Sequence, residues 1–265
     1  MRYVFDNDFH IHSYISLCSK DPEQTPEAIL QYAIDNGLKT IVLTDHFWDS
    51  EISGASGFYS TQNFDWISRS KPLPQADGIR FLFGCEADFD KDLRLGMPLS
   101  RFDDFDFVVI PTTHLHMKGF TITEEDAETC EGRARVWIKR LEWLLTMPLP
   151  FHKIGLGHLA CPLIARGREN YLKVLELLPE QKLFELFTKC AELGVGIELN
   201  SSDMSFSDEE ADTVLRIFRI AKKCGCKFYM GSDAHHPNGL QAAKAIFERA
   251  IDCLGLTEDD KFKIL

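Results

Sequence analysis

Short apolar runs alternate with segments of helical periodicity along most of the chain. In the helical segments, apolar residues recur three or four positions apart, as at Val214, Leu215 and Phe218. The runs that we interpret as strands cover residues 3–11, 40–43, 79–85, 105–110, 154–156, 196–199 and 227–230. A strand followed by a helix, repeated about seven times, predicts a parallel α/β fold.

The first helix has sequence signals at both ends. Thr25 is a suitable N-cap, Pro26 favours the first helical position, and Gly37 favours the C-terminal end. No repeat, linker or low-complexity tract divides the chain. We therefore expect residues 1–265 to form a single domain, of the size of an α/β barrel of roughly 250 residues.

Two long stretches, residues 47–77 and 117–132, interrupt the alternation. The first is rich in Gly and Ser and contains aromatic residues such as Trp48, Phe58 and Tyr59. Loops of this length in a compact domain often contribute to function. A surface insertion packed on its own aromatic residues explains them equally well, so both interpretations stay open.

Charge and cysteine content narrow the possible partners. The net charge of −12 argues against nucleic acid, which requires clustered Lys and Arg, but bound cations would allow a small phosphorylated substrate. The eight cysteines form no C-x-x-C pair, and no signal peptide or membrane-spanning run is recognisable. We expect a cytoplasmic protein with free thiols and no membrane partner; the sequence leaves the oligomeric state open.

The histidines provide the main functional signal. Six of the nine lie just beyond the C-terminal ends of predicted strands, where the active sites of parallel barrels are built. Two carboxylates, from Glu86 and Asp233, lie at strand ends in the same way. The histidines are His10, His12, His46, His114, His158 and His235. Each has a structural explanation by itself, but their combination predicts a metal site.

Strand alternation refines this prediction. His10 and His12 should face the same side and Ile11 the opposite side, because side chains alternate along a strand. Asp233 and His235 share a face if the extended conformation continues. Glu86 is the natural bridge between two ions, whereas the neighbouring Cys85 should point away.

Several other polar residues have weaker signals. Glu198 and Asn200 end the sixth strand and would support either the metal site or the substrate. We interpret His116 as a solvated loop residue, although a ligand or a substrate contact is also possible. The cations Arg166, Arg168 and Lys118 follow site-bearing segments and are candidates for binding phosphate, which matches the bidentate geometry of arginine.

Six short motifs, in this order, resemble those of the PHP family, the polymerase and histidinol phosphatase domain proteins. They span nearly the whole chain and read DFHIHS at 8–13, TDH at 44–46, GCEAD at 84–88, TTH at 112–114, GLGH at 155–158 and GSDAH at 231–235. The resemblance implies a distorted, TIM-barrel-like (β/α)7 barrel with a site for two or three divalent ions of Zn, Mn or Fe.

The resemblance also implies how the ligands are distributed. The first ion would be held by His10, His12, Glu86 and Asp233. Glu86 would bridge to a second ion, completed by His114 and His158. His46 and His235 would hold the third ion. Many family members have a further histidine shortly after H-x-H, whereas residues 13–21 contain none. Cys18 or Asp21 would replace it, and we favour Asp21 because it precedes a proline in a predicted exposed turn.

The activity implied is hydrolysis of a small phosphomonoester by a metal-bridging hydroxide, with Glu86, Asp233 and His235 as catalytic residues. Histidinol phosphate, and with it a role in histidine biosynthesis, is one candidate. An amidohydrolase-like enzyme acting on a C–N bond is the alternative, since those barrels also begin with H-x-H. They commonly need a lysine at a middle strand end, which is absent here. A non-enzymatic metal-binding domain and a nuclease are further alternatives, disfavoured by the retained ligands and the acidic charge.

Overall fold

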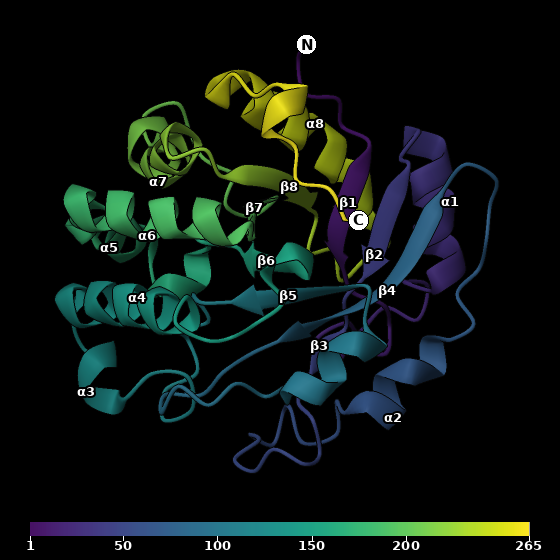
Figure 1. The fold of residues 1–265 in the computed structure, drawn as a ribbon, viewed down its shortest axis with the longest axis horizontal. Helices are drawn as coiled ribbons and strands as arrows, with labels where there is room; N and C mark the ends of the chain where they lie inside the picture. The colour runs from purple at the N-terminus through teal and green to yellow at the C-terminus, as the bar shows by residue number, and fades with distance from the viewer. Residues whose placement is uncertain (265) are drawn as a thin grey trace.

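The computed structural model describes residues 1–264, which form a nearly closed parallel barrel with helices on its outer face (Figure 1). The seven main strands follow one another in the order β1-β2-β4-β5-β6-β7-β8, and the short β3 pairs with β4. Their bounds are β1 Asn7–Ile11, β2 Thr40–Leu43, β3 His46–Phe47, β4 Arg80–Ala87, β5 Phe107–Pro111, β6 Ile154–Gly157, β7 Gly196–Asn200 and β8 Lys227–Gly231. The fold class expected from the alternation is therefore confirmed.

The first and last strands approach each other and nearly close the barrel. The backbone N–H of His12 donates to the carbonyl of Ala234 at 3.1 Å, and that of Asp233 donates to the carbonyl of His10 at 2.7 Å. A side chain adds a further hydrogen bond between these two segments, because Asp8 Oδ1 accepts from the N–H of Ser232 at 2.9 Å. Closure therefore brings the H-x-H motif of β1 next to the segment after β8.

Helices cover the outside of the sheet, and a small apolar cluster fills the inside. The helices are α1 Pro26–Asn36, α2 Phe64–Ile67, α3 Glu124–Ala127, α4 Cys130–Leu144, α5 Arg168–Leu177, α6 Glu180–Leu193, α7 Ala211–Lys223 and α8 Pro237–Leu254. The inner cluster consists of Phe9, Val42, Phe107, Val109, Tyr229, Phe262 and Ile264. Ile11 and Cys85 belong to the outer core, so both face away from the barrel interior as predicted. None of the helices of residues 1–264 is long and apolar enough to cross a lipid bilayer.

The ends of α1 follow the predicted signals. The Thr25 side chain accepts from the N–H of Ala28, and Gly37 ends the helix with a φ of 68°, a conformation that glycine adopts without strain. Strand bounds differ more from the prediction. β1 begins at Asn7 rather than at residue 3, and β4 continues to Ala87, so Glu86 lies within a strand. The two-residue β3 is too short for a periodic pattern to reveal it.

Candidate metal centre

All eight residues predicted to hold metal at the strand ends lie together at one rim of the barrel. Six are buried, and Asp233 and His235 are partly buried; the eight are His10, His12, His46, Glu86, His114, His158, Asp233 and His235. Ligand atoms of these residues form three overlapping groups: His10, His12 and Glu86; Glu86, His114 and His158; and His12, His46 and His235. The predicted gathering of side chains is thus present.

Glu86 lies between two groups of histidines. Its Oε2 is 3.5 Å from His12 Nε2 and 3.7 Å from His10 Nε2, while its Oε1 is 3.0 Å from His158 Nε2 and 3.7 Å from His114 Nε2. One oxygen of this carboxylate therefore faces the imidazoles of the second group, while the other faces those of the first group and also His46, whose Nδ1 lies at 2.7 Å. This arrangement suits a carboxylate that bridges two metal ions.

Asp233 reaches the same place although its backbone is not extended. Its φ is 53°, and that of His158 is 30°, both in the left-handed region that non-glycine residues rarely adopt. The Oδ1 atom of Asp233 lies 3.2 Å from His12 Nε2 and 3.6 Å from His10 Nε2. Strained backbone of this kind concentrates at functional sites. The backbone after β8 does not stay extended, as the prediction for Asp233 and His235 had required. Both side chains nevertheless reach the rim.

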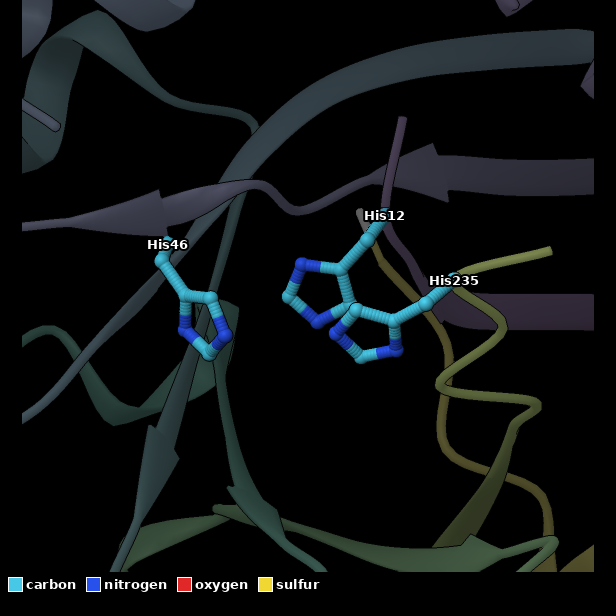
Figure 2. A group of neighbouring side chains, drawn as sticks. All are labelled: His12, His46 and His235. Atoms are coloured by element: carbon cyan, nitrogen blue, oxygen red, sulfur yellow. The ribbon is translucent and has the colours of Figure 1, made fainter. Parts of the chain in front are cut away.

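The third group is formed by His12, His46 and His235, whose rings converge from three separate segments (Figure 2). The rings of His12 and His235 stack with centroids 4.2 Å apart, and His46 faces His12 at 4.6 Å. His46 lies in β3, in register with Glu86 of β4. The expected approach of His46 and His235 is therefore observed, with His12 between them.

Five of the histidines are oriented by a partner on Nδ1, which leaves Nε2 directed at the site. Such partners fix the tautomer and ring orientation of metal ligands. The pairs are His10 with Glu198 at 2.7 Å, His12 with Ser16 at 3.1 Å, His114 with Asp88 at 2.9 Å, His158 with Thr113 at 2.9 Å, and His235 with the carbonyl of Asp233 at 2.7 Å. Sequence reasoning left Glu198 undecided and missed the other side chains, although Asp88 lies two residues beyond Glu86.

Electrostatics within the cluster favour ionised carboxylates. Burial raises the pKa of Glu86, but His46, His10 and His114 outweigh it and hold that pKa well below its usual value. Burial lowers the pKa of His10, but Glu198, Asp233 and Glu86 outweigh it and raise that pKa well above its usual value. In the metal-free protein, the carboxylates therefore favour a proton on His10, whereas burial together with His235 and His46 lowers the pKa of His12. Metal binding would displace the proton on His10.

Two buried atoms of the cluster indicate that these residues fit metal. His46 Nδ1 and Glu86 Oε2 lie 2.7 Å apart, yet neither makes a hydrogen bond of acceptable geometry. Buried polar atoms are rarely left without a partner, because each costs about 1–3 kcal/mol. Imidazole and carboxylate donors are a suitable set for Zn, Mn or Fe, and an ion would give both atoms a partner.

The two candidates for completing the third group, Asp21 and Cys18, are placed differently. Asp21 Oδ2 lies 2.7 Å from His236 Nε2 instead of facing His46 and His235. Cys18 lines the same cavity as these two histidines. Burial raises the pKa of its thiol, but contacts with His235 and His46 outweigh this and lower the pKa to about 7. The structure thus reverses our order of preference.

A cavity of about 410 Å³ opens over the cluster. The long loops contribute to its wall through Phe58, Tyr59 and Met117, so both stretches take part in the site. His116 is exposed but also lines the cavity, which corrects its interpretation as a purely solvated residue.

The three predicted phosphate-binding cations lie outside this cavity. Arg166 and Lys118 line an adjacent one. Arg168 forms a two-pronged ion pair with Glu210 at 2.6 and 2.7 Å and is not among the described residues that line either cavity. Arg168 is therefore not placed to bind substrate in this cavity, because its guanidinium is already paired on the surface.

Glu198 supports the cluster from β7. Its Oε1 orients His10, and its Oε2 accepts from the backbone N–H of His158. A Cβ at Gly231 would lie 1.7 Å from Glu198 Oε1, so the glycine of GSDAH leaves room for this carboxylate. Glu198 is thus a positioning residue for ligands of both main groups.

We expect Glu198→Gln to weaken metal binding by about 10- to 100-fold, the usual effect of losing an outer partner of a ligand. Competition with a chromogenic chelator measures this affinity. Activity should recover at saturating metal, because the ligands themselves remain. An unchanged affinity would show that Glu198 does not position His10.

Fold and site together define the class: a β/α-barrel protein with a cluster of histidines and carboxylates suited to bind metal at its C-terminal rim. The PHP domain model matches residues 8–202, and the chain belongs to this family. A "Probable phosphatase" of Caldicellulosiruptor saccharolyticus is 24% identical over 227 residues, covering 85% of this chain and 78% of that protein. Another "Probable phosphatase", of Caldicellulosiruptor bescii, is 24% identical over 211 residues, covering 79% and 72%.

A solved structure shares the fold. The crystal structure of histidinol phosphate phosphatase from Lactococcus lactis, complexed with Zn, L-histidinol and phosphate, superimposes with a TM-score of 0.67. It is 18% identical in sequence and covers 94% of each chain. The family resemblance expected from the six motifs is therefore confirmed, and a metal-dependent phosphoesterase is the enzyme class that these relatives support.

Proposed function

We propose that the protein hydrolyses a small phosphomonoester at a centre of two or three divalent metal ions. The observation that carries this proposal is the position of Glu86, with one oxygen toward His10 and His12 and the other toward His114 and His158. Paired metal sites of this kind are common in phosphatases, where they stabilise both the attacking and the leaving oxygen.

Bound ions would supply Lewis acidity, lowering the pKa of water from 15.7 to about 7 and neutralising phosphate charge. The chain's own residues have definable roles. Glu86 and Asp233 hold negative charge beside the histidines and fix the spacing of the two main groups. His235 is partly exposed at the cavity and is the candidate to contact the substrate phosphate. Phe58 and Tyr59 close one wall and exclude water from it.

A panel of phosphoesters tests this proposal. Protein reconstituted separately with Zn, Mn and Fe would be assayed for phosphate release from small monoesters, including histidinol phosphate, the candidate suggested by the structural neighbour. We expect turnover of at least one monoester that requires added metal. Hydrolysis of amide substrates without any phosphate release would favour the amidohydrolase alternative and contradict the proposal.

The third group leads to a separate prediction. We expect Cys18 to complete a site with His46 and His235 as a thiolate, because it lines the same cavity as both rings and these histidines lower the pKa of its thiol to about 7. Cobalt-substituted protein should then show a thiolate-to-metal charge-transfer band in the near ultraviolet. Cys18→Ser should remove the band, whereas Asp21→Asn should keep it. A band that survives Cys18→Ser, or none in the wild type, would show that Cys18 is not a ligand.

A further inference from the structure

A second cavity, of about 490 Å³, opens beside the metal centre and differs from it in charge. The two cavities share His116 and Leu163. The other lining residues of the second cavity are Lys118, Arg133, Pro162, Ala165 and Arg166. Three of these are cations and none is acidic, although the whole chain has a net charge of −12. A local excess of positive charge of this kind attracts anions.

Arg133 is a buried cation without a counterion. Its side chain is 9% exposed, and its guanidinium donates to the carbonyls of Leu115, Ile164 and Ala127. Within residues 1–264, no carboxylate forms an ion pair with it. Arginine does not lose its proton in proteins, so this wall of the cavity remains positively charged.

Arg166 adds a cation that is free to move. It lies just after the short 3-10 helix Pro162–Ile164, and its side chain is exposed. None of the ion pairs found in residues 1–264 involves it, and only its backbone carbonyl accepts a hydrogen bond, from Asn170. Lys118 is paired with Glu128 at 2.8 Å, but such exposed pairs contribute little and open readily.

The first cavity, which opens over the histidine cluster, indicates what kind of substrate body would lie between the two cavities. Apart from the metal-binding cluster, His116 and Cys18, its walls are Phe58, Tyr59, Met117 and Leu163. Its two acidic residues, Glu86 and Asp233, are both directed at histidines. No side chain of this wall is suited to pair with an ammonium group, because both carboxylates would be engaged by metal. An apolar or aromatic body fits between the two cavities.

We propose that the second cavity binds a second anionic group on the leaving group of the substrate. This inference rests on the proposed function. The substrate class is then a phosphomonoester of an apolar or aromatic body that carries a carboxylate or a second phosphate. Arg166 forms the charge-assisted contact, and Arg133 supplies fixed positive charge behind it. A cationic leaving group, such as that of histidinol phosphate, is disfavoured by the same charges.

A matched substrate series tests the charge preference. Phenyl phosphate would be compared with its 4-carboxy, 4-phosphate and 4-aminomethyl derivatives, using metal-loaded protein. We expect kcat/KM to be about tenfold higher for an anionic derivative than for phenyl phosphate, and lowest for the aminomethyl compound. Arg166→Met should remove the advantage of the anionic derivatives while leaving phenyl phosphate within about twofold. The control Arg219→Met removes one equal charge on α7 and should change none of these values.

A binding measurement tests the anion site independently of whether the protein hydrolyses a phosphomonoester. Calorimetric titration with benzene-1,4-dicarboxylate should show a site that is about tenfold weaker in Arg166→Met and unchanged in Arg219→Met. If none of the monoesters is hydrolysed, the proposed function fails, and this titration still decides whether the anion site exists. Equal rates across the series, a preference that survives Arg166→Met, or dicarboxylate binding that does not compete with substrate would each overturn the inference.

Discussion

Glu86→Gln is expected to reduce kcat/KM by about a thousandfold or more. Glu86 directs one oxygen at His12 and the other at His158, so it would serve two ions; glutamine keeps only one of these oxygens as a possible ligand and loses the negative charge. Ions in such sites contribute several kcal/mol to transition-state stabilisation, and each 1.36 kcal/mol corresponds to about a tenfold change in rate. Steady-state kinetics with a phosphomonoester found in the panel would measure this loss.

The control for Glu86→Gln is Glu27→Gln, which changes an exposed carboxylate on α1. This variant should keep wild-type activity, because Glu27 is exposed and lines neither of the two cavities. Circular dichroism should show native secondary structure for both variants. The large apolar core between the sheet and the helices stabilises the fold without a contribution from metal. Comparable activity of Glu86→Gln and wild type would refute the bridging role.

Removal of metal is the second change with a large expected effect. Dialysis against a chelator should lower turnover to about 1% or less of its initial value, and re-addition of Zn, Mn or Fe should restore it. The thermal midpoint should fall, because ions that bind only the folded state stabilise it by mass action. The fold itself should persist, because histidines with a raised pKa, such as His10, offset the charge of Glu86 and Asp233 in the metal-free protein.

Two measurements on one sample check this prediction. Phosphate release follows the activity, and differential scanning calorimetry follows the midpoint, each before and after chelation. A protein that keeps full turnover after its metal content has fallen to zero would require a metal-independent mechanism, and the His–Glu cluster would then be structural.

Much of the fold and of the ligand set could be predicted because both depend on strand periodicity. Apolar runs locate the strands, and the rule that parallel strands present their C-terminal ends at one rim locates His114, His158 and Glu86. His46 was found because it follows the predicted strand at 40–43, although β3 was not predicted, because a two-residue strand leaves no alternation in the sequence.

The remaining features depend on contacts between distant segments. Glu198 reaches His10 and His158 across the barrel, at separations that no local pattern encodes. The choice between Cys18 and Asp21 depends on the loop after β1, which Asp45 fixes by accepting hydrogen bonds from Ser13 and Ser16. Local exposure alone favours Asp21, whereas this loop conformation turns Cys18 toward the cavity.

Metal content tests the central claim most directly. Protein purified without chelators and analysed by inductively coupled plasma mass spectrometry should contain at least two transition-metal ions per chain, as the groups around Glu86 require. The Glu86→Gln variant should contain fewer. Less than about half an ion per chain, with no uptake of Zn, Mn or Fe on reconstitution, would contradict the assignment of this rim as a metal centre.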